Sequence, residues 1–303
     1  MKIVSFVTPQ RAFPVPGALL ASGNEVLEFS APAARLPHPA DPLSWFDLDG
    51  AALQGAIELV HRLSEDDQHA RELRTAGAVL PLERVRLVAP VPRPGKVICI
   101  GLNYRDHAAE SGLALPERPL CFSKFSSCVV GPGADIALPP GSEQVDYEAE
   151  LGFVIGRRAA RVPAAQALRC VLGYANVNDV SARDFQFADG QWQRGKSCDT
   201  FCPFGPYVVT PDELGDPHRL RIALRLNGRT LQDSNTDQLI FGIEALIEHL
   251  SRFVTLEPGD LISTGTPPGV GFARKPPIFV GPGDLMEVEI EGLGVLANRV
   301  RRA

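Results

Sequence analysis

The chain has 303 residues, of which 45% are hydrophobic and 22% are charged, and its formal net charge is −6 at pH 7. This composition is typical of a globular protein that is long enough to bury a sizeable core. The negative charge and the lack of a basic block argue against a nucleic-acid partner, and the absence of an apolar run of about twenty residues argues against a membrane span.

Residues 1–89 are predicted to form a small α+β domain. The chain starts with MKIVSFV, which is typical of a strand and lacks the long apolar core and cleavage site of a signal peptide, so we expect a cytoplasmic location. Further along, Leu53, Ile57 and Val60 recur at helical spacing. The stretch PVPRPG at 90–95 predicts a stiff linker that ends this domain.

Residues 96–303 are predicted to form a second domain that is rich in strands. The chain has 28 Gly and 27 Pro, which favour many short elements joined by tight turns. The sequence Pro-Gly-Asp-Leu opens a strand-like run twice, in EPGDLISTG and in GPGDLMEVEI. FGIEALIEHLSRF predicts an amphipathic helix with Ile243, Leu246 and Ile247 on one face. The fold class expected from these elements is α+β and β-rich.

Three acids alternate with apolar residues in DYEAELGFVIG, which begins at Asp146. Side chains two residues apart in a strand project from one face, so Glu148 and Glu150 would lie about 7 Å apart along the chain, with Asp146 beside them. Such carboxylates repel one another unless water or a hard divalent cation lies between them. The run MEVEIEG has the same spacing and is typical of a half-exposed strand. The spacing alone therefore leaves a solvated face and a metal site both open.

A second polar cluster follows a strand-like run in GYANVNDVSARDFQ. Its Asp179 would add a third carboxylate to Glu148 and Glu150, and such a set would leave coordination positions open for water and substrate. The residues by themselves leave an ordinary turn as an equal alternative.

Five motifs together resemble the fumarylacetoacetate hydrolase family. In chain order they are IGLNYRDHAAE, DYEAELGFVIG, NVNDVSARDFQ, GKSCDTFCPFGPYVVT and ISTGTPPGVG. The resemblance covers the chain from about residue 96 onward and points to members similar to acylpyruvases or to 2-hydroxyhepta-2,4-diene-1,7-dioate isomerases. It implies a mixed β-sandwich roll that forms homodimers, with one Mg²⁺ or Mn²⁺ per subunit and Ca²⁺ as a substitute in crystals. It also implies that Glu148, Glu150 and Asp179 are the metal ligands.

The same resemblance implies catalytic roles for three residues. His107 and Glu110 are three apart, so on a helical turn Glu110 would orient the imidazole of His107 as a base for water. A surface histidine on a polar loop is the alternative interpretation of that spacing. The polar segment 105–118, which carries the pair, would suit a lid over the substrate. Lys196 in RGKSCDTF matches a family lysine that can stabilise a developing oxyanion.

Further side chains are expected to support the site or contact the substrate. Arg183 suits either a bidentate contact with a carboxylate or a structural ion pair, and the sequence does not separate these two roles. The loop TGTPPGVG lacks the spacing of a nucleotide-binding motif, but its Thr266 matches a loop that binds substrate carboxylates in the family. The full set expected at or near the substrate is Arg183, Gln186, Thr266, Tyr104, Arg105 and Lys124.

The function expected first is metal-dependent hydrolysis of a C–C bond in a β-diketo acid such as an acylpyruvate or fumarylpyruvate. The alternative keeps the metal site and changes the reaction to decarboxylation or tautomerisation of oxaloacetate-like 2-oxo acids. It also includes lyase, dehydratase or hydrolase chemistry on a ureido or 2,4-diketo-3-deoxy sugar acid. Each version predicts a small anionic substrate. A non-catalytic metal-binding protein is the third class, and the presence of every site residue argues against it.

Overall fold

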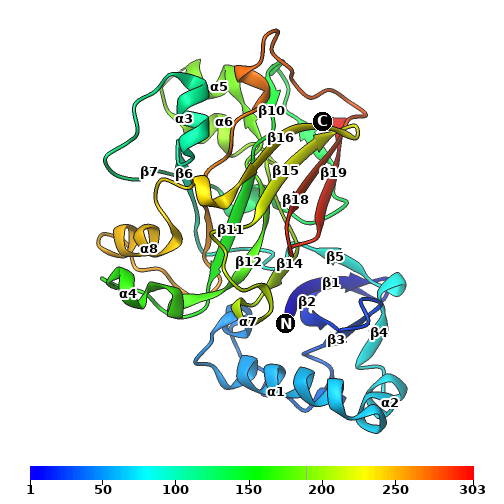
Figure 1. Ribbon diagram of the computed structural model, residues 1–303. Coiled ribbons are helices and arrows are strands. Elements are labelled where there is room, and N and C mark those ends of the chain that lie inside the picture. The colour runs from blue at the N-terminus through cyan, green and yellow to red at the C-terminus, as the bar shows by residue number, and fades with distance from the viewer. Residues whose placement is uncertain (189) are drawn as a thin grey trace.

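The protein is described by a computed structural model that covers residues 1–188 and 190–303. Within those residues the largest element is a 12-stranded sheet that crosses the whole molecule (Figure 1). Its strands, in spatial order, are β4 Val79–Pro81, β3 Glu25–Glu28, β2 Arg11–Leu19, β1 Lys2–Thr8, β14 Cys202–Val209, β12 Val171–Asn178, β11 Ala149–Ile155, β17 Leu261–Ser263, β6 Val97–Gly101 and β7 Leu120–Lys124. Two short strands complete it: β5 Arg86–Val88 pairs with β1, and β8 Val129–Val130 pairs with β14.

A second sheet covers the centre of the first. Strands β11, β12 and β14 of the large sheet contact β15, β18 and β19 of the second, and the two sheets enclose the main core (Figure 1). In spatial order the second sheet has five strands: β16 Arg229–Asn235, β15 Arg221–Leu226, β18 Leu285–Ile290, β19 Val295–Arg302 and β9 Ile136–Leu138. This sheet-rich α+β architecture confirms the predicted fold class.

The region 1–89 shares the large sheet with the rest of the chain. Strand β1 pairs antiparallel with β14, with Lys2 opposite Val209 and Ile3 opposite Val208. The backbone hydrogen bonds of the sheet therefore continue from one half of the chain into the other. The domain boundary at 90–95 remains our proposal.

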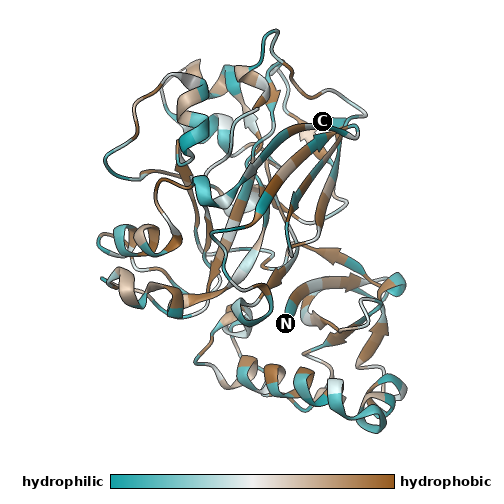
Figure 2. Cartoon of the chain, in the orientation of Figure 1, coloured by the Kyte–Doolittle hydropathy of each residue, from teal (hydrophilic) through white to brown (hydrophobic). Residues whose placement is uncertain are grey.

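Helices lie on the outside of the sheets, and they carry both hydrophilic and hydrophobic residues (Figure 2). Their bounds are α1 Ala51–Glu65, α2 Asp67–Thr75, α3 Arg105–Ser111, α4 Ala164–Ala167, α5 Arg183–Ala188, α6 Trp192–Lys196, α7 Pro211–Leu214 and α8 Ile243–Ser251. Short 3-10 turns join them to the strands: η1 Pro32–Ala34, η2 Pro42–Phe46, η3 Leu82–Arg84, η4 Ser126–Cys128, η5 Leu168–Cys170, η6 Thr236–Gln238 and η7 Gly271–Ala273. In the described part of the chain, no helix has the length and hydropathy that crossing a membrane requires.

Three predicted patterns can be compared directly with burial. In α8 the predicted face is fully buried, as the 3.6-residue period requires. In α1 the buried stripe is centred on Leu53, Ala56 and Leu59, while Ile57 and Val60 lie half-buried on its flank. The acids of MEVEIEG alternate with buried apolar residues in β18, so that run is a half-exposed strand as predicted.

The elements that carry the predicted site residues meet at one end of the molecule. Helices α3, α5 and α6 gather at the end opposite the region 1–89 (Figure 1). A two-stranded sheet made of β10 Val145–Asp146 and β13 Ser181–Ala182 lies in the same part of the fold. This end forms the candidate site.

Candidate active site

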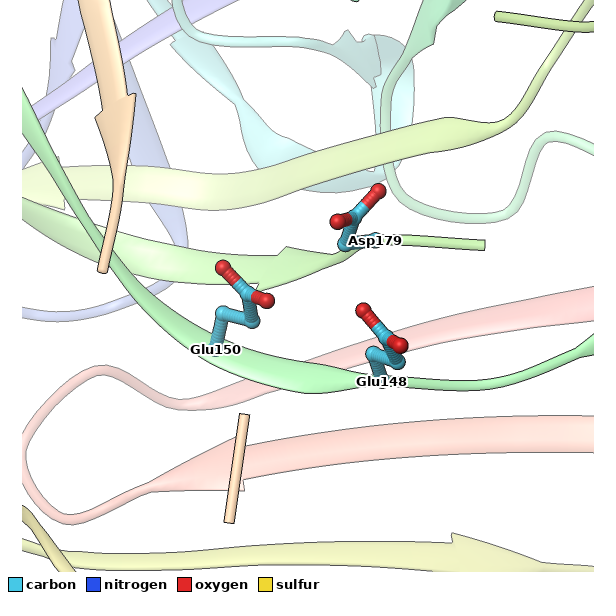
Figure 3. A group of neighbouring side chains, drawn as sticks. All are labelled: Glu148, Glu150 and Asp179. Carbon is cyan, nitrogen blue, oxygen red and sulfur yellow. The ribbon is translucent and has the colours of Figure 1, made fainter. Parts of the chain in front are cut away.

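Three buried carboxylates converge where β11 and β12 pair. Glu148 immediately precedes β11, Glu150 lies within it, and Asp179 directly follows β12. The two strands are antiparallel, with Ala149 opposite Asn178, so this register brings Asp179 beside the two glutamates. One ligand atom from each residue lies within 4.8 Å of the others, and Figure 3 shows the three carboxylate groups directed toward one another. The geometry brings together the three ligands that the sequence predicts.

A break between β10 and β11 places Glu148 in this group. The break spans Tyr147 and Glu148, where side-chain amides replace part of the strand pairing. The amide N–H of Glu148 donates to Asn178 Oδ1 at 3.0 Å, and that of Ala149 donates to Gln232 Oε1 at 2.9 Å. Because buried backbone donors are satisfied in this way, the chain can leave regular strand geometry without an energetic penalty.

Two hydrogen bonds to one carboxylate oxygen hold Glu150 in place. Its Oε2 accepts hydrogen bonds from Ser263 Oγ at 2.5 Å and from the N–H of Gly265 at 2.9 Å. Gly265 has a φ of +101°, and a Cβ there would lie 2.8 Å from Asn103 Cβ, so the position requires glycine. Burial, together with the charges of Asp179 and Glu148, raises the pKa of Glu150 well above its usual value.

Buried cations neutralise the other two carboxylates. Lys196 Nζ lies 2.7 Å from Glu148 Oε2 and 2.7 Å from Asp179 Oδ2, and the ammonium of Lys124 binds the other oxygen of Asp179. Burial alone would raise the pKa of Glu148, but the charges of Lys196 and Arg183 outweigh it and hold this pKa well below its usual range. Glu148 is therefore held in its charged form.

Asp146 has a structural role outside the triad. It lies in β10, before the break, and accepts from Arg183 Nε at 2.9 Å and from the N–H groups of Gly271 at 2.7 Å and Phe272 at 3.0 Å. The alternation expected from an unbroken strand would have placed it on the face of Glu148, but the break at Tyr147 ends that alternation. Asp146 instead fixes the 271–272 loop.

Arg183 joins these two groups of residues. One NH2 group contacts Asp146 Oδ2 at 2.8 Å and Glu148 Oε1 at 2.6 Å, and NH1 donates to Gln186 Oε1 at 3.0 Å. In this structure the guanidinium therefore forms ion pairs, and contact with a substrate carboxylate stays a prediction. Asp184, the residue next to Arg183 in the chain, accepts instead from Ser142 Oγ and from the N–H of Glu143.

A cavity of about 220 Å³ opens above the triad. Seven of the residues expected at the site line it, namely His107, Glu148, Glu150, Arg183, Gln186, Lys196 and Thr266. Gln186 is buried, and its carbonyl oxygen is taken by Arg183, so its NH2 group is the part left to donate. Thr266 Oγ1 donates to the carbonyl of Ala149 and accepts from Gln232.

His107 and Glu110 form the expected pair on α3. His107 Nδ1 lies 3.1 Å from Glu110 Oε2, and Glu110 also accepts from the N–H of Gly269 at 3.1 Å. A proton on Nδ1 satisfies this hydrogen bond, so we assign Nε2 as the free acceptor of the neutral imidazole. Residues Arg105–Ser111 of the segment predicted as a lid thus form a helix, and Glu110 ties this helix to the 264–271 loop.

Three residues that were expected to contact the substrate do not line the cavity. Arg105 donates to the carbonyl oxygens of Leu239 at 2.5 Å and Asp237 at 3.4 Å, which fastens the start of α3. Tyr104 is fully buried beside this helix. Lys124 lies beneath Asp179, where it also donates to the carbonyl of Val180 at 3.0 Å. Direct contact between these residues and a substrate is not supported by their positions.

The wall of the cavity includes residues that sequence reasoning missed or treated as packing. Phe122, Phe187, Trp192 and Phe272 line it together with aliphatic side chains. Trp192 and Phe187 lie in short helices, and aromatic residues in a helix carry no sequence signal that distinguishes a core from a pocket. Sequence reasoning also missed Ser263, which donates a hydrogen bond to Glu150 and belongs to the motif ISTGTPPGVG.

Residues 96–301 match the family model described as fumarylacetoacetate (FAA) hydrolase C-terminal. The chain belongs to the fumarylacetoacetate hydrolase family.

Relatives within this family extend over the whole chain. The mitochondrial oxaloacetate tautomerase FAHD2A of Bos taurus is 44% identical over 99% of this chain and 91% of its own length, and its Homo sapiens counterpart is 42% identical with the same coverage. A solved structure of a putative HpcE protein from Mycobacterium smegmatis superposes with a TM-score of 0.80 at 38% identity, covering 100% of both chains. The 5-carboxymethyl-2-hydroxymuconate delta-isomerase from the same organism has a TM-score of 0.76 at 35% identity, also over 100% of both chains.

These relatives correct one expectation. The bovine and human proteins are named as mitochondrial, so the prediction of a cytoplasmic location is wrong by this comparison. The prediction depended on MKIVSFV, and that segment forms β1 in the middle of the large sheet. Its apolar residues therefore indicate packing in the sheet, and they do not indicate where in the cell the protein is located.

The residues of the site fit the divalent metal on which members of this family depend. All three ligands offer carboxylate oxygens, which hard divalent cations prefer. Glu150 accepts hydrogen bonds from a hydroxyl and a backbone N–H, and burial together with the charges of Asp179 and Glu148 raises its pKa. Four buried carboxylates against three buried cations leave the cluster with a formal charge of −1: Asp146, Glu148, Glu150 and Asp179 against Lys124, Arg183 and Lys196.

Affinity for Mg²⁺ or Mn²⁺ is expected to fall as the pH falls below the raised pKa of Glu150. Burial and two neighbouring negative charges favour the protonated form of this carboxyl group, and a metal must displace that proton. The affinity should fall by about tenfold per pH unit for one displaced proton. Calorimetric titrations from about pH 6 to about pH 9, in buffers of different ionisation enthalpy, measure both the affinity and the proton released. A pH-independent affinity without proton release would contradict this.

Proposed function

We propose that the protein is a divalent-metal-dependent tautomerase that interconverts the keto and enol forms of oxaloacetate or a closely similar 2-oxo acid. The observation that carries this proposal is that His107, which Glu110 contacts at 3.1 Å, lines the same small cavity as Glu148 and Glu150. The names of the relatives that match 99% of the chain favour tautomerisation among the reactions such a site supports. Hydrolysis of a C–C bond, which we expected first, is the competing reaction.

The residues of the cavity divide the chemistry between them. A divalent cation held by Glu148, Glu150 and Asp179 would polarise the 2-oxo group of the substrate. His107 Nε2 is the group that takes the proton from C3, and Glu110 stabilises the imidazolium that results. His107 then delivers this proton to the 2-oxo oxygen, and the reverse sequence converts enol to keto. The NH2 group of Gln186 is placed to donate to a substrate oxygen.

Tautomerisation also demands less of this site than hydrolysis does. It moves one proton between C3 and the 2-oxo oxygen, so a single acid–base residue is sufficient. Hydrolysis requires in addition an activated water molecule and a second proton transfer to the leaving carbon. The cavity holds about 220 Å³ and has one histidine in its lining, which suits the simpler reaction.

Metal removal provides the direct test. The rate at which enolic oxaloacetate becomes the keto form, followed by ultraviolet absorbance, is expected to exceed the rate with metal alone and to return to that background when EDTA is added. Acetylpyruvate and fumarylpyruvate are tested in parallel for C–C cleavage. Metal-dependent cleavage of these acids without tautomerisation of oxaloacetate would overturn the proposal in favour of a hydrolase.

The family resemblance also leads us to propose a homodimer. Light scattering coupled to gel filtration measures the mass of the assembly in solution. A mass equal to that of one chain at the concentrations used for assay would contradict this part of the proposal.

A further inference from the structure

The side chain of Asn103 is fully buried and bonds to two distant segments of the chain. Its Nδ2 group donates to the carbonyl oxygens of Thr264 at 2.7 Å and Phe241 at 3.1 Å, and its Oδ1 accepts from the N–H of Phe241 at 2.9 Å. A backbone N–H can only donate and a carbonyl can only accept, so these partners fix which end of the amide is which. Asn103 therefore presents its NH2 group to Thr264.

The ends of two neighbouring strands bring Asn103 to this position. Strands β6 and β17 are parallel neighbours in the large sheet. Because β6 ends at Gly101 and β17 ends at Ser263, the chain leaves both strands at the same edge of the sheet. The N–H of Thr264 still pairs with the carbonyl of Leu151 in β11 at 3.0 Å. The carbonyl of Thr264 lies beyond this ladder, and Asn103 satisfies it.

The peptide unit that Asn103 contacts also holds Glu150. The carbonyl of Thr264 and the N–H of Gly265 belong to one peptide plane, and in a trans peptide these two groups point in opposite directions. Asn103 binds the oxygen end of this plane at 2.7 Å, while the nitrogen end donates to Glu150 Oε2 at 2.9 Å. Buried hydrogen bonds linked in this way polarise one another, so loss of the first weakens the second.

Glu150 depends on such bonds more than the other two carboxylates of the triad do. Glu148 and Asp179 both contact a buried ammonium group at 2.7 Å. The bonds described for Glu150 come from neutral groups, the hydroxyl of Ser263 and the N–H of Gly265. A neutral donor restrains a carboxylate less strongly than a cation does. The direction of the Gly265 N–H therefore helps to set the direction of the Glu150 carboxylate.

Close packing adds to the effect of the hydrogen bond. A Cβ at Gly265 would lie 2.8 Å from Asn103 Cβ and 3.0 Å from the carbonyl oxygen of Ile100, so the backbone at this position lies directly against Asn103. The peptide unit 264–265 therefore has little room to rotate while the side chain of Asn103 is in place.

We infer that Asn103 is a positioning residue for the metal centre, which directs the carboxylate of Glu150 toward the other two ligands through the peptide unit 264–265. This inference rests on the metal-dependent function proposed above and assigns a further residue to it. Asn103 lies outside the lining of the cavity, so it acts without touching the substrate. Loss of its NH2 group should weaken metal binding first and the reaction only as a consequence.

Asn103→Ala is expected to weaken Mn²⁺ binding by about ten- to hundredfold, the usual effect of removing a residue that orients a metal ligand. Calorimetric titration of the metal-free protein with Mn²⁺ measures this affinity. At saturating Mn²⁺ the kcat for oxaloacetate should return to within about threefold of the wild-type value, because excess metal fills the weakened site. Asn103→Ser keeps a hydroxyl in place of the amide and should show a smaller loss in the same direction, so it provides the test if the alanine variant does not fold.

Asn298→Ala serves as the matched control. Asn298 is also a buried asparagine, and its Nδ2 group also donates to two backbone carbonyls, those of Gly131 at 3.0 Å and Ala134 at 2.8 Å. It lies in β19 and has no bond to the peptide unit that holds Glu150. Its variant should lose stability in urea denaturation as the Asn103 variant does, but it should keep the Mn²⁺ affinity of the wild type.

Three results would overturn the inference and leave the proposed function standing. The first is a wild-type Mn²⁺ affinity in the folded Asn103 variants. The second is an equal loss of affinity in the Asn103→Ala and Asn298→Ala proteins, which would show a general effect of destabilisation. The third is a loss of kcat that saturating Mn²⁺ does not restore, which would show that Asn103 acts through α3 and His107. Failure of the wild-type protein to bind Mn²⁺ would instead remove the proposed function itself.

Discussion

Replacing His107 by alanine is expected to lower the rate of oxaloacetate tautomerisation by about 10²–10⁴-fold, the usual contribution of a general acid–base residue. The imidazole is the acid–base group that lines the cavity beside the triad, and Glu110 holds it at 3.1 Å. Metal affinity should stay unchanged, because His107 is not a ligand. Stopped-flow absorbance gives the rate, and calorimetric titration with Mn²⁺ gives the affinity.

The chain provides a matched control for this variant. His69 and Glu72 in α2 have the same spacing of three residues and lie 3.6 Å apart, but they belong to the region 1–89. His69→Ala should therefore keep full activity. If His107→Ala also kept its activity, the dyad would have no part in the mechanism. Loss of metal binding in that variant would show that the histidine supports the triad instead.

Substitutions at Asp179 and Glu150 are expected to remove metal binding in both cases and to have opposite effects on stability. Asp179 is the shared partner of Lys124 and Lys196, and all three side chains are buried. Asp179→Asn leaves two buried ammonium groups with one less negative charge, which should lower the free energy of unfolding by about 3–5 kcal/mol. Urea denaturation of the metal-free proteins measures this loss.

Glu150→Gln should leave the metal-free protein as stable as the wild type or more so. Because the pKa of Glu150 is raised in the folded state, the stability linked to its protonation is present at low pH and is lost as the pH rises through that value. Glutamine cannot ionise, and its carbonyl can still accept from Ser263 and Gly265. The difference between variant and wild type should therefore widen as the pH rises.

Glu287→Gln is the corresponding control, since Glu287 lies half-exposed in β18 and pairs with Arg225. It should retain metal binding and show no such pH-dependent gain. A destabilised Glu150→Gln protein, measured without metal at alkaline pH, would contradict the idea that Glu150 is the uncompensated charge of the triad.

The sequence by itself determined those features of this protein that depend only on residues close together in the chain. The period of β18, the apolar face of α8 and the spacing of His107 and Glu110 are local properties of strands and helices, so the chain reveals them directly. The triad could also be predicted, but only because several motifs together resemble one family. The spacing of Glu148 and Glu150 is shared by the half-exposed acids of β18 and is not sufficient.

Only the tertiary structure decided which partner each buried charge has. Arg183 pairs with Asp146 and Glu148 rather than Asp184, because β10 and β13 lie side by side and bring residues 37 and 35 positions apart into contact. The break at Tyr147 turns Asp146 away from the carboxylate triad, although simple alternation would place it beside Glu148 and Glu150. Likewise, Phe187 and Phe272 meet at the cavity through loops and short helices. Such contacts depend on how distant segments pack, and no periodic pattern along the chain encodes them.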